Sequence, residues 1–225
     1  GSGSSSDPCA ETYRGPSAAS EPEVKAIVEY TKALFPTDQR KTYPEGTQLG
    51  VAYPQSAKGV FMDIHSYKEI MIFPWSFRNS KGPNDYAFEA LVNKCKHFNG
   101  YALSGPTRAA FLYLVSGGSN DWAYGTLGAA AMSFEIGTSF YQDCNYFNKS
   151  IVPKNIEALT YAAKIASAPY LLPKGPDVIS ITFGATSVAA NGTLKVSVTA
   201  SDLLWSAEKF DSSKQGIASV RLWVD

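Results

Sequence analysis

The chain has 225 residues, of which 44% are hydrophobic and 18% charged, so it can form one large domain or one domain with part of another. Its formal net charge of zero at pH 7 excludes the electrostatic attraction expected of a protein that binds nucleic acid or an anionic membrane surface. No apolar run approaches the ~20 residues that a membrane helix needs. We therefore expect neither a nucleic-acid partner nor a membrane span.

The first part of the chain predicts a loop, a helix and a second loop. Residues 1–19 are rich in Ser, Gly and Pro and predict a surface loop. The sequence SEPE at 20–23 predicts a capping box, and the apolar residues that follow recur at helical spacing to residue 35. We expect this helix to lie on one face of a sheet. Residues 36–57 have no period and predict a long loop.

The middle of the chain alternates predicted strands and helices. Two apolar runs, 60–64 and 70–73, predict strands that are buried on both faces. This alternation favours an α/β fold with a mixed, mainly parallel sheet flanked by helices. The further elements expected are a helix over 84–98 capped by Asn84 or Asp85, a tight turn at 117–118, a short helix over 120–124, a strand over 130–136 and a helix over 153–166.

The composition changes near residue 170, which predicts a domain boundary. We expect one domain over 1–170, a Pro-rich linker over 171–176 and a β module over 177–225. The last segment alternates apolar and polar residues around an Asn-Gly turn, a pattern typical of antiparallel strands. It is shorter than the ~100 residues of a complete immunoglobulin-like sandwich, so we expect only part of such a module.

Three short segments occur in a characteristic order and spacing: HSY at 65–67, SGGSNDW at 116–122 and SFE at 133–135. The first lies within a longer window, FMDIHSYKEIMIFPW at 61–75. In order and spacing these segments resemble the second half of a zinc metallocarboxypeptidase of the carboxypeptidase A type. The resemblance covers residues 1–170 and implies a secreted or periplasmic, zinc-dependent exopeptidase that hydrolyses the C-terminal bond of a peptide or protein.

Three residues take chemical roles through this resemblance, although each also has a structural alternative. A lone histidine at a strand end is more often structural than metal-binding, but His65 matches the family's later zinc ligand. Glu135 is either a salt-bridged core residue or the family's catalytic glutamate, which moves a proton from the attacking water to the leaving amine. Tyr113 is either a core residue or the mobile tyrosine that closes over the substrate.

The resemblance also implies a pocket for the substrate's C-terminal side chain. Asn120 matches the residue at its floor, where an amide favours a polar or broad preference, and not a charged one. Arg108 matches a pocket-wall position and would favour acidic side chains, but a surface arginine is an equal alternative. The remaining residues expected to line the cleft are Ser66, Tyr67 and Ser133. Cis peptide bonds are implied at Ser66–Tyr67 and Pro74–Trp75.

The chain departs from the family in its metal ligands. The family's H-x-x-E pair and its Asn-Arg pair for the substrate carboxylate have no counterpart here, and the second histidine, His97, is not followed by such a glutamate. We expect the missing N-terminal part of the domain to be a partner of this chain, and the chain alone to be inactive. The alternative is a non-catalytic, peptidase-like protein that binds peptides. Cys95 and Cys144 could form a disulfide.

Overall fold

The computed structural model describes residues 3–40, 49–104, 113–201, 217 and 219–221. Among these residues, four strands form one mixed sheet in the order β1-β4-β2-β3, namely β1 (Val60–His65), β4 (Ala130–Glu135), β2 (Ile70–Ile72) and β3 (Ala102–Ser104). β4 pairs in parallel with β1 and antiparallel with β2, while β2 pairs in parallel with β3. The predicted α/β architecture with a mixed, mainly parallel sheet is confirmed.

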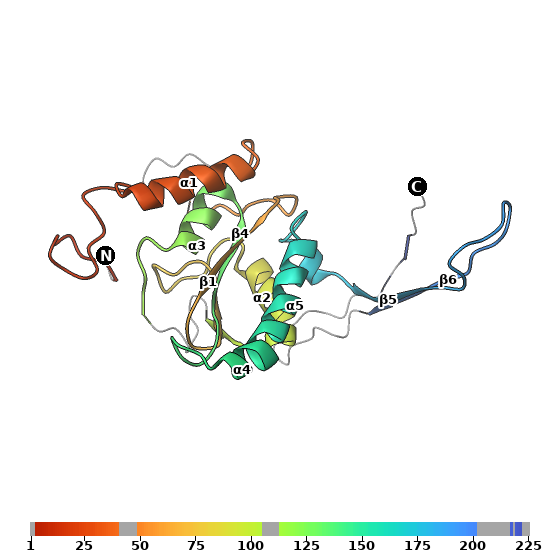
Figure 1. Cartoon of the computed structure of the whole chain (residues 1–225). Helices are drawn as coiled ribbons and strands as arrows, with labels where there is room; N and C mark the ends of the chain where they lie inside the picture. Colours follow the sequence, from red (N-terminus) through yellow and green to blue (C-terminus); the bar gives the residue numbers. More distant parts are fainter. Residues whose placement is uncertain (1–2, 41–48, 105–112, 202–216, 218, 222–225) are drawn as a thin grey trace.

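Helices pack around this sheet, as Figure 1 shows. Helix α2 (Asp85–Asn99) packs along α5 (Val152–Lys164), and α3 (Ser119–Trp122) contacts β1 and β4. The π-helix η1 (Ala123–Leu127) continues α3. A second helical segment precedes α5 and was not predicted, namely α4 (Cys144–Tyr146) followed by the π-helix η2 (Phe147–Ile151). No helix among the described residues is long and apolar enough to cross a membrane.

Aromatic rings fill the core between the sheet and α2. Phe88 stacks on Phe73 with ring centroids 5.9 Å apart and meets Tyr124 and Tyr170 edge-on at 5.1 and 5.7 Å. All four side chains are buried. Such edge-on and offset contacts add to the hydrophobic contribution of ring burial. These four aromatic residues therefore belong to the hydrophobic core.

Three predictions about the N-terminal half were wrong. The capping box does not form, because Ser20 Oγ donates to Glu21 Oε1 and no side chain caps α1 (Pro22–Leu34). The apolar stripe of α1 is also largely exposed, with Ile27 57% and Leu34 64% accessible. Strand β1, expected to be buried on both faces, is half-exposed because it has only β4 as a neighbour among the described strands.

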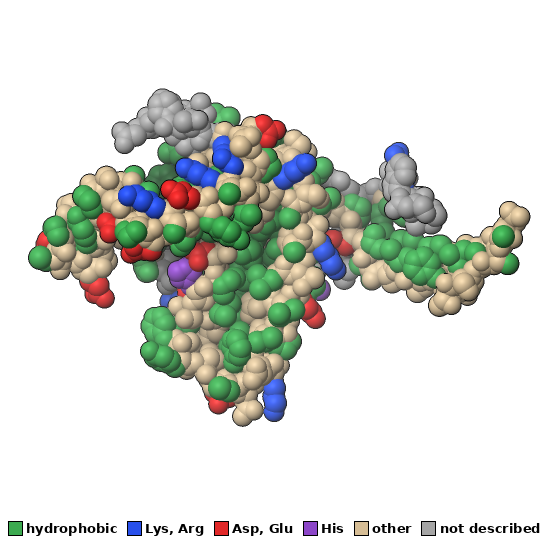
Figure 2. Space-filling view, turned by 45° about the horizontal axis from the view of Figure 1, so that its top comes forward, with side chains coloured by type: hydrophobic (Ala, Val, Ile, Leu, Met, Phe, Trp, Pro, Cys, Tyr) green, Lys and Arg blue, Asp and Glu red, His purple; other side chains and the backbone are tan. Residues whose placement is uncertain are grey.

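The C-terminal strands form a separate sheet. β5 (Asp177–Phe183) pairs antiparallel with β6 (Val196–Ser201), in the two segments where strands were predicted. The register places Ile181 and Phe183 beside Val198 and Val196 on one apolar face. Figure 2 shows hydrophobic side chains along this ribbon. The strand expected at 219–225 is absent from the described part, 219–221, and its remainder lies outside the described residues.

The predicted linker packs against the sheet domain. Within it, η3 (Leu172–Lys174) contains the buried Pro173, and Lys174 Nζ lies 5.2 Å from the centre of the Tyr86 ring on α2. Asp177, the first residue of β5, forms an ion pair with the buried Lys94 of α2. The ribbon is therefore attached to α2 through side-chain contacts as well as through the chain.

All three cysteines are free. Cys95 is buried in α2, where burial raises the pKa of its thiol to about 12, while Cys9 and Cys144 are exposed. The pairing of Cys95 with Cys144 that the sequence left open is therefore not formed.

Candidate active site

Two of the predicted site residues lie next to each other at the ends of neighbouring strands. His65 ends β1, Glu135 ends β4, and the two are paired in the parallel register. Two residues earlier, Asp63 is paired with Ser133. Because side chains alternate along a strand, these four residues share one face of the sheet. The backbone N–H of Ile136 donates to His65 O at 2.8 Å and fixes the two strand ends together.

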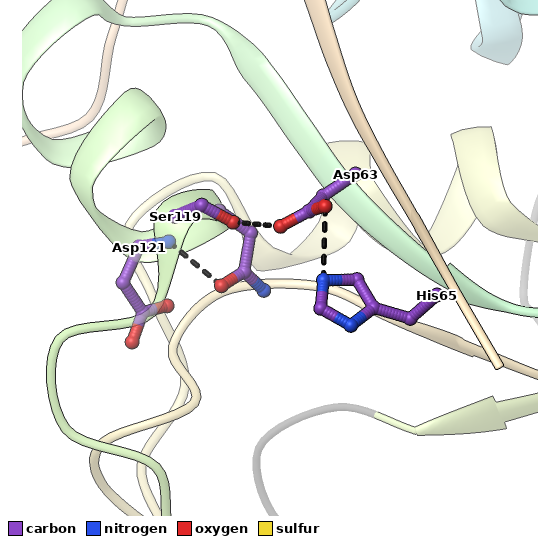
Figure 3. A network of polar contacts seen from close by, with 5 residues as sticks. Asp63, His65, Ser119 and Asp121 are labelled. Carbon is purple, nitrogen blue, oxygen red and sulfur yellow. Dashed lines mark hydrogen bonds and ion pairs between the residues drawn. The ribbon is translucent and has the colours of Figure 1, made fainter. Parts of the chain in front are cut away.

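A chain of polar contacts runs across this face (Figure 3). His65 Nε2 donates to Asp63 Oδ1 at 2.9 Å, and Ser119 Oγ, at the start of α3, donates to Asp63 Oδ2. The side chain of His65 is 54% exposed, that of Asp63 27%. Among the described residues no hydrogen-bond partner occupies His65 Nδ1, so this nitrogen is available to a metal.

The carboxylate of Glu135 lies in a mixed environment. Partial burial raises its pKa, the nearby His65 lowers it, and the charge of Asp63 raises it. The net direction is upward from the ordinary value. A raised pKa strengthens a carboxylate as a proton acceptor, which is the property that a general base needs.

A second group of polar residues lies beside this face, at the end of the β2 segment. Asn120 is only 4% exposed, and its Nδ2 donates to Ser76 Oγ at 3.1 Å. The carboxylate of Asp121 accepts the backbone N–H groups of Ser76 at 2.9 Å and of Phe77 at 3.1 Å. Burial raises the pKa of Asp121 to about 6, although these N–H groups and Arg78 act in the opposite direction.

The peptide bonds Ser66–Tyr67 and Pro74–Trp75 are both cis, as predicted. The first follows His65 directly and presents Tyr67, whose ring meets Phe140 edge-on with centroids 4.8 Å apart. Both rings are partly exposed, Tyr67 by 41% and Phe140 by 70%. The side chain of Ser66 is also exposed.

The remaining predicted site residues are less closely gathered. Tyr113 is 67% exposed, which excludes the core role that was its alternative. Two residues later, Val115 N donates to Ser76 O at 2.9 Å, and Ser116 Oγ is hydrogen-bonded to Ser4 Oγ at 2.7 Å. Tyr113 thus belongs to a segment anchored beside Ser76. Arg108 lies outside the described residues.

Sequence reasoning gave no role to three residues that the structure places in these networks. Asp63 and Ser119 were visible only as neighbours of the motifs, and Ser76 follows the Pro-aromatic pair. Asp63 precedes His65 by two positions on a strand, and this spacing by itself indicates that both side chains lie on one face of the sheet. The contacts of Ser119 and Ser76 join residues far apart in the chain and had no sequence signal.

The described residues supply only part of the ligands that a metal ion needs. Among the described residues no group of three His, Cys, Asp or Glu side chains is arranged to hold an ion. The free Nδ1 of His65 nevertheless fits a single zinc–histidine bond, since zinc binds neutral imidazole through either ring nitrogen. His97 lies on α2 against Phe98, with ring centroids 5.3 Å apart.

Known proteins are similar to this chain in sequence and in fold. Carboxypeptidase A2 of Mus musculus is 28% identical over 158 residues, which cover 68% of this chain and 33% of the relative. Carboxypeptidase B of Homo sapiens is 30% identical over 138 residues, which cover 60% and 28%. The chain thus spans about a third of the length of the relatives that it matches.

Solved structures give the same fold. Bovine thrombin-activatable fibrinolysis inhibitor, solved in complex with tick carboxypeptidase inhibitor, matches with a TM-score of 0.54 and 25% identity, over 75% of this chain and 52% of that one. Carboxypeptidase A from Helicoverpa armigera matches with a TM-score of 0.52 and 19% identity, over 75% and 39%. The sheet and its helices are therefore those of a carboxypeptidase fold, present in part.

A sequence model of the zinc carboxypeptidases, Peptidase_M14, matches residues 1–158. The chain belongs to this family of metallopeptidases.

Proposed function

We propose that this chain supplies part of the active site of a zinc carboxypeptidase, which removes the C-terminal residue of a peptide or protein. The observation that carries the proposal is the pairing of His65 with Glu135 at the ends of β1 and β4. A metal ligand and a general base must both reach the same water molecule. Two side chains at the ends of neighbouring strands lie close enough together to do so.

Each predicted residue then has one task. Zinc, when bound, acts as a Lewis acid that activates water and polarises the scissile carbonyl. His65 contributes one ligand through Nδ1, while Glu135 takes a proton from the attacking water and gives it to the leaving amine. Tyr113 closes over the bound substrate from its exposed segment. Asn120 forms the floor of the pocket for the C-terminal side chain, and Ser66, Tyr67 and Ser133 line the cleft. Arg108 is kept as a wall residue of the same pocket.

The other ligands come from outside this chain in our proposal. The chain contains two histidines, and His97 lies on α2 rather than at a strand end near Glu135. Two surfaces suit the docking of the rest of the domain: the exposed apolar stripe of α1, and the edge of β1, which pairs only with β4 among the described strands. An unpaired strand edge offers backbone hydrogen bonds to a further strand.

We further propose the division into a peptidase domain at 1–170, a linker at 171–176 and a β module at 177–225. The separate β5–β6 sheet supports a boundary after the linker. An exposed apolar ribbon face supports completion of this module by further strands, in an immunoglobulin-like sandwich. The similarity to carboxypeptidases A and B also leads us to propose a secreted or periplasmic location.

The proposal is tested with the natural protein that contains this chain and, separately, with residues 1–225 alone. We expect the natural protein to release C-terminal amino acids from peptides, a zinc chelator to stop the release, and added zinc to restore it. Glu135→Gln should lower kcat by roughly 100-fold or more, since general acid–base catalysis contributes 10²–10⁴-fold. Glu157→Gln, the same change on the exposed side of α5, should leave the rate unchanged.

Residues 1–225 alone should release nothing, because one histidine cannot hold zinc in a catalytic site. Release by the chain alone that a chelator abolishes would contradict the assignment of the remaining ligands. If the natural protein instead binds peptides with free C-termini and hydrolyses none, the protein is a peptide-binding relative without catalysis.

A further inference from the structure

The contacts of Asp63 carry an inference that rests on the proposed function and goes one step beyond it. Both oxygens of this carboxylate are engaged: Oδ1 accepts from His65 Nε2 at 2.9 Å, and Oδ2 accepts from Ser119 Oγ. Asp63 is thereby fixed between a strand residue and the first residue of α3 (Figure 3). A carboxylate held on both oxygens cannot turn away from the imidazole without losing a hydrogen bond.

This contact determines which ring nitrogen of His65 carries the proton. An ionised carboxylate only accepts hydrogen bonds, so the nitrogen that faces it must carry hydrogen. Neutral His65 therefore has its proton on Nε2 and its lone pair on Nδ1. The nitrogen that lacks a partner among the described residues is the one prepared to bind a metal.

The same chain of contacts reaches Asn120, the proposed floor of the side-chain pocket. Ser119 is followed directly by Asn120 and Asp121, both buried and both bonded to Ser76. A shift of α3 would thus move the oxygen donor to Asp63 and the pocket floor together. The orientation of His65 and the position of the proposed pocket floor therefore depend on one short helix.

We propose that Asp63 is a positioning residue, which with Ser119 holds His65 as the Nε2–H tautomer and directs Nδ1 to the zinc ion. Carboxylates behind metal-binding histidines fix the tautomer and raise the basicity of the ligand. Here the carboxylate comes from the same strand, two residues before its histidine, and α3 supplies the second contact.

The tautomer is measured by nitrogen NMR of the imidazoles in residues 1–225, without metal and at about pH 9, where an ordinary histidine is neutral. The chain has two histidines, and His97→Gln assigns the signals. We expect the Nε2–H form of His65 to exceed the other by roughly tenfold or more, as a charge-assisted hydrogen bond allows. Asp63→Ala should return His65 to the mixture found in a short peptide.

Two variants complete this measurement. Asp63→Asn keeps an acceptor oxygen and should retain most of the Nε2–H excess, which also covers the case in which the alanine variant does not fold. Asp38→Ala, the same deletion at an exposed aspartate, should change nothing. A dominant Nδ1–H form in the unmodified chain, or a ratio unaffected by Asp63→Ala, would overturn the proposal.

A second measurement follows zinc affinity in the natural protein by competition with a chelator. Asp63→Ala should weaken zinc binding by about 10–100-fold, the range found when a group behind a metal ligand is removed. Ser119→Ala should weaken it less, because Asp63 keeps His65 as a partner. If the unmodified protein binds no zinc, the proposed function fails while the tautomer result stands. If zinc binds equally well to Asp63→Ala, the positioning role is wrong.

Discussion

Asn120 and Ser76 are bonded to each other through Nδ2 and Oγ at 3.1 Å, while Asn120 Oδ1 accepts the backbone N–H of Asp121 at 2.9 Å. Donor and acceptor of this amide are thus both used within the protein. In the proposed pocket, a substrate side chain that reaches Asn120 meets a neutral amide, which is consistent with the proposed preference for uncharged C-terminal residues.

Exchange of this amide for a carboxylate should therefore change the specificity of the natural protein. Asn120→Asp places a negative charge at a buried position beside Ser76, so a C-terminal Lys or Arg becomes the favoured partner. We expect the ratio of kcat/KM for a peptide ending in Lys to one ending in Leu to rise by roughly 100-fold. The exposed variant Asn79→Asp, with the same charge change, should leave the ratio unchanged.

The raised pKa of Asp121 predicts a specific pH dependence of stability. The folded state binds this proton more tightly than the unfolded state does, so Asp121 lowers the free energy of unfolding as pH rises from 3.8 to about 6. The shift corresponds to about 3 kcal/mol. In Asp121→Asn this part of the decline should disappear when urea unfolding is compared at the two ends of the interval. Asp38→Asn should keep the decline of the unmodified chain.

The side chain of Tyr101 connects the segment that follows Glu135 with helix α5. Its hydroxyl accepts from Gly137 N at 3.3 Å and from Asn155 Nδ2 at 2.8 Å, and the residue is buried. Tyr101→Phe leaves both donors without this acceptor, which should cost about 1–3 kcal/mol of unfolding free energy and speed hydrogen exchange at Gly137. Tyr30→Phe, on the exposed face of α1, should cost nothing measurable. An unchanged exchange rate at Gly137 in Tyr101→Phe would show that the 3.3 Å contact is not a hydrogen bond.

The ion pair between Lys94 and Asp177 should be a major contact between α2 and the β5–β6 ribbon. The side chain of Lys94 is 3% exposed, and its replacement removes the ammonium group of a largely buried ion pair. Lys94→Met should lower the free energy of unfolding by about 3 kcal/mol, near the lower limit for a broken buried pair. Lys164→Met, at an exposed lysine at the end of α5, should cost less than about 1 kcal/mol. Equal losses in the two variants would contradict this difference.

The sequence predicted the fold well where apolar runs are long and bounded. The strands that carry His65 and Glu135 and the helix after Asn84 were placed within a residue or two. Strand β3 was missed because three residues carry too little periodicity. The turn of π-helix before α5 was missed because its wider winding departs from the period of 3.6 residues.

In the candidate site, spacing along one strand indicated which side chains share a face of the sheet. Contacts between different elements had no signal in the sequence. The resemblance implied that His65 and Glu135 belong to one site and that the bonds Ser66–Tyr67 and Pro74–Trp75 are cis, but the pairing of the two residues in a parallel register had to come from the structure. The exposure of β1 and of the α1 stripe was not foreseen, because an apolar pattern shows which face can be buried but not what covers it.

The parallel pairing of β1 with β4 also affects how the protein folds. Residues of these strands are far apart in the sequence, with β2, α2, β3 and α3 between them. Contacts of such high contact order form slowly, because a long loop must close before any pairing energy is gained. His65 and Glu135 therefore meet only when the most distant contact of the sheet is made. During refolding, the site should be assembled after the local contacts of α2 and α5 are in place.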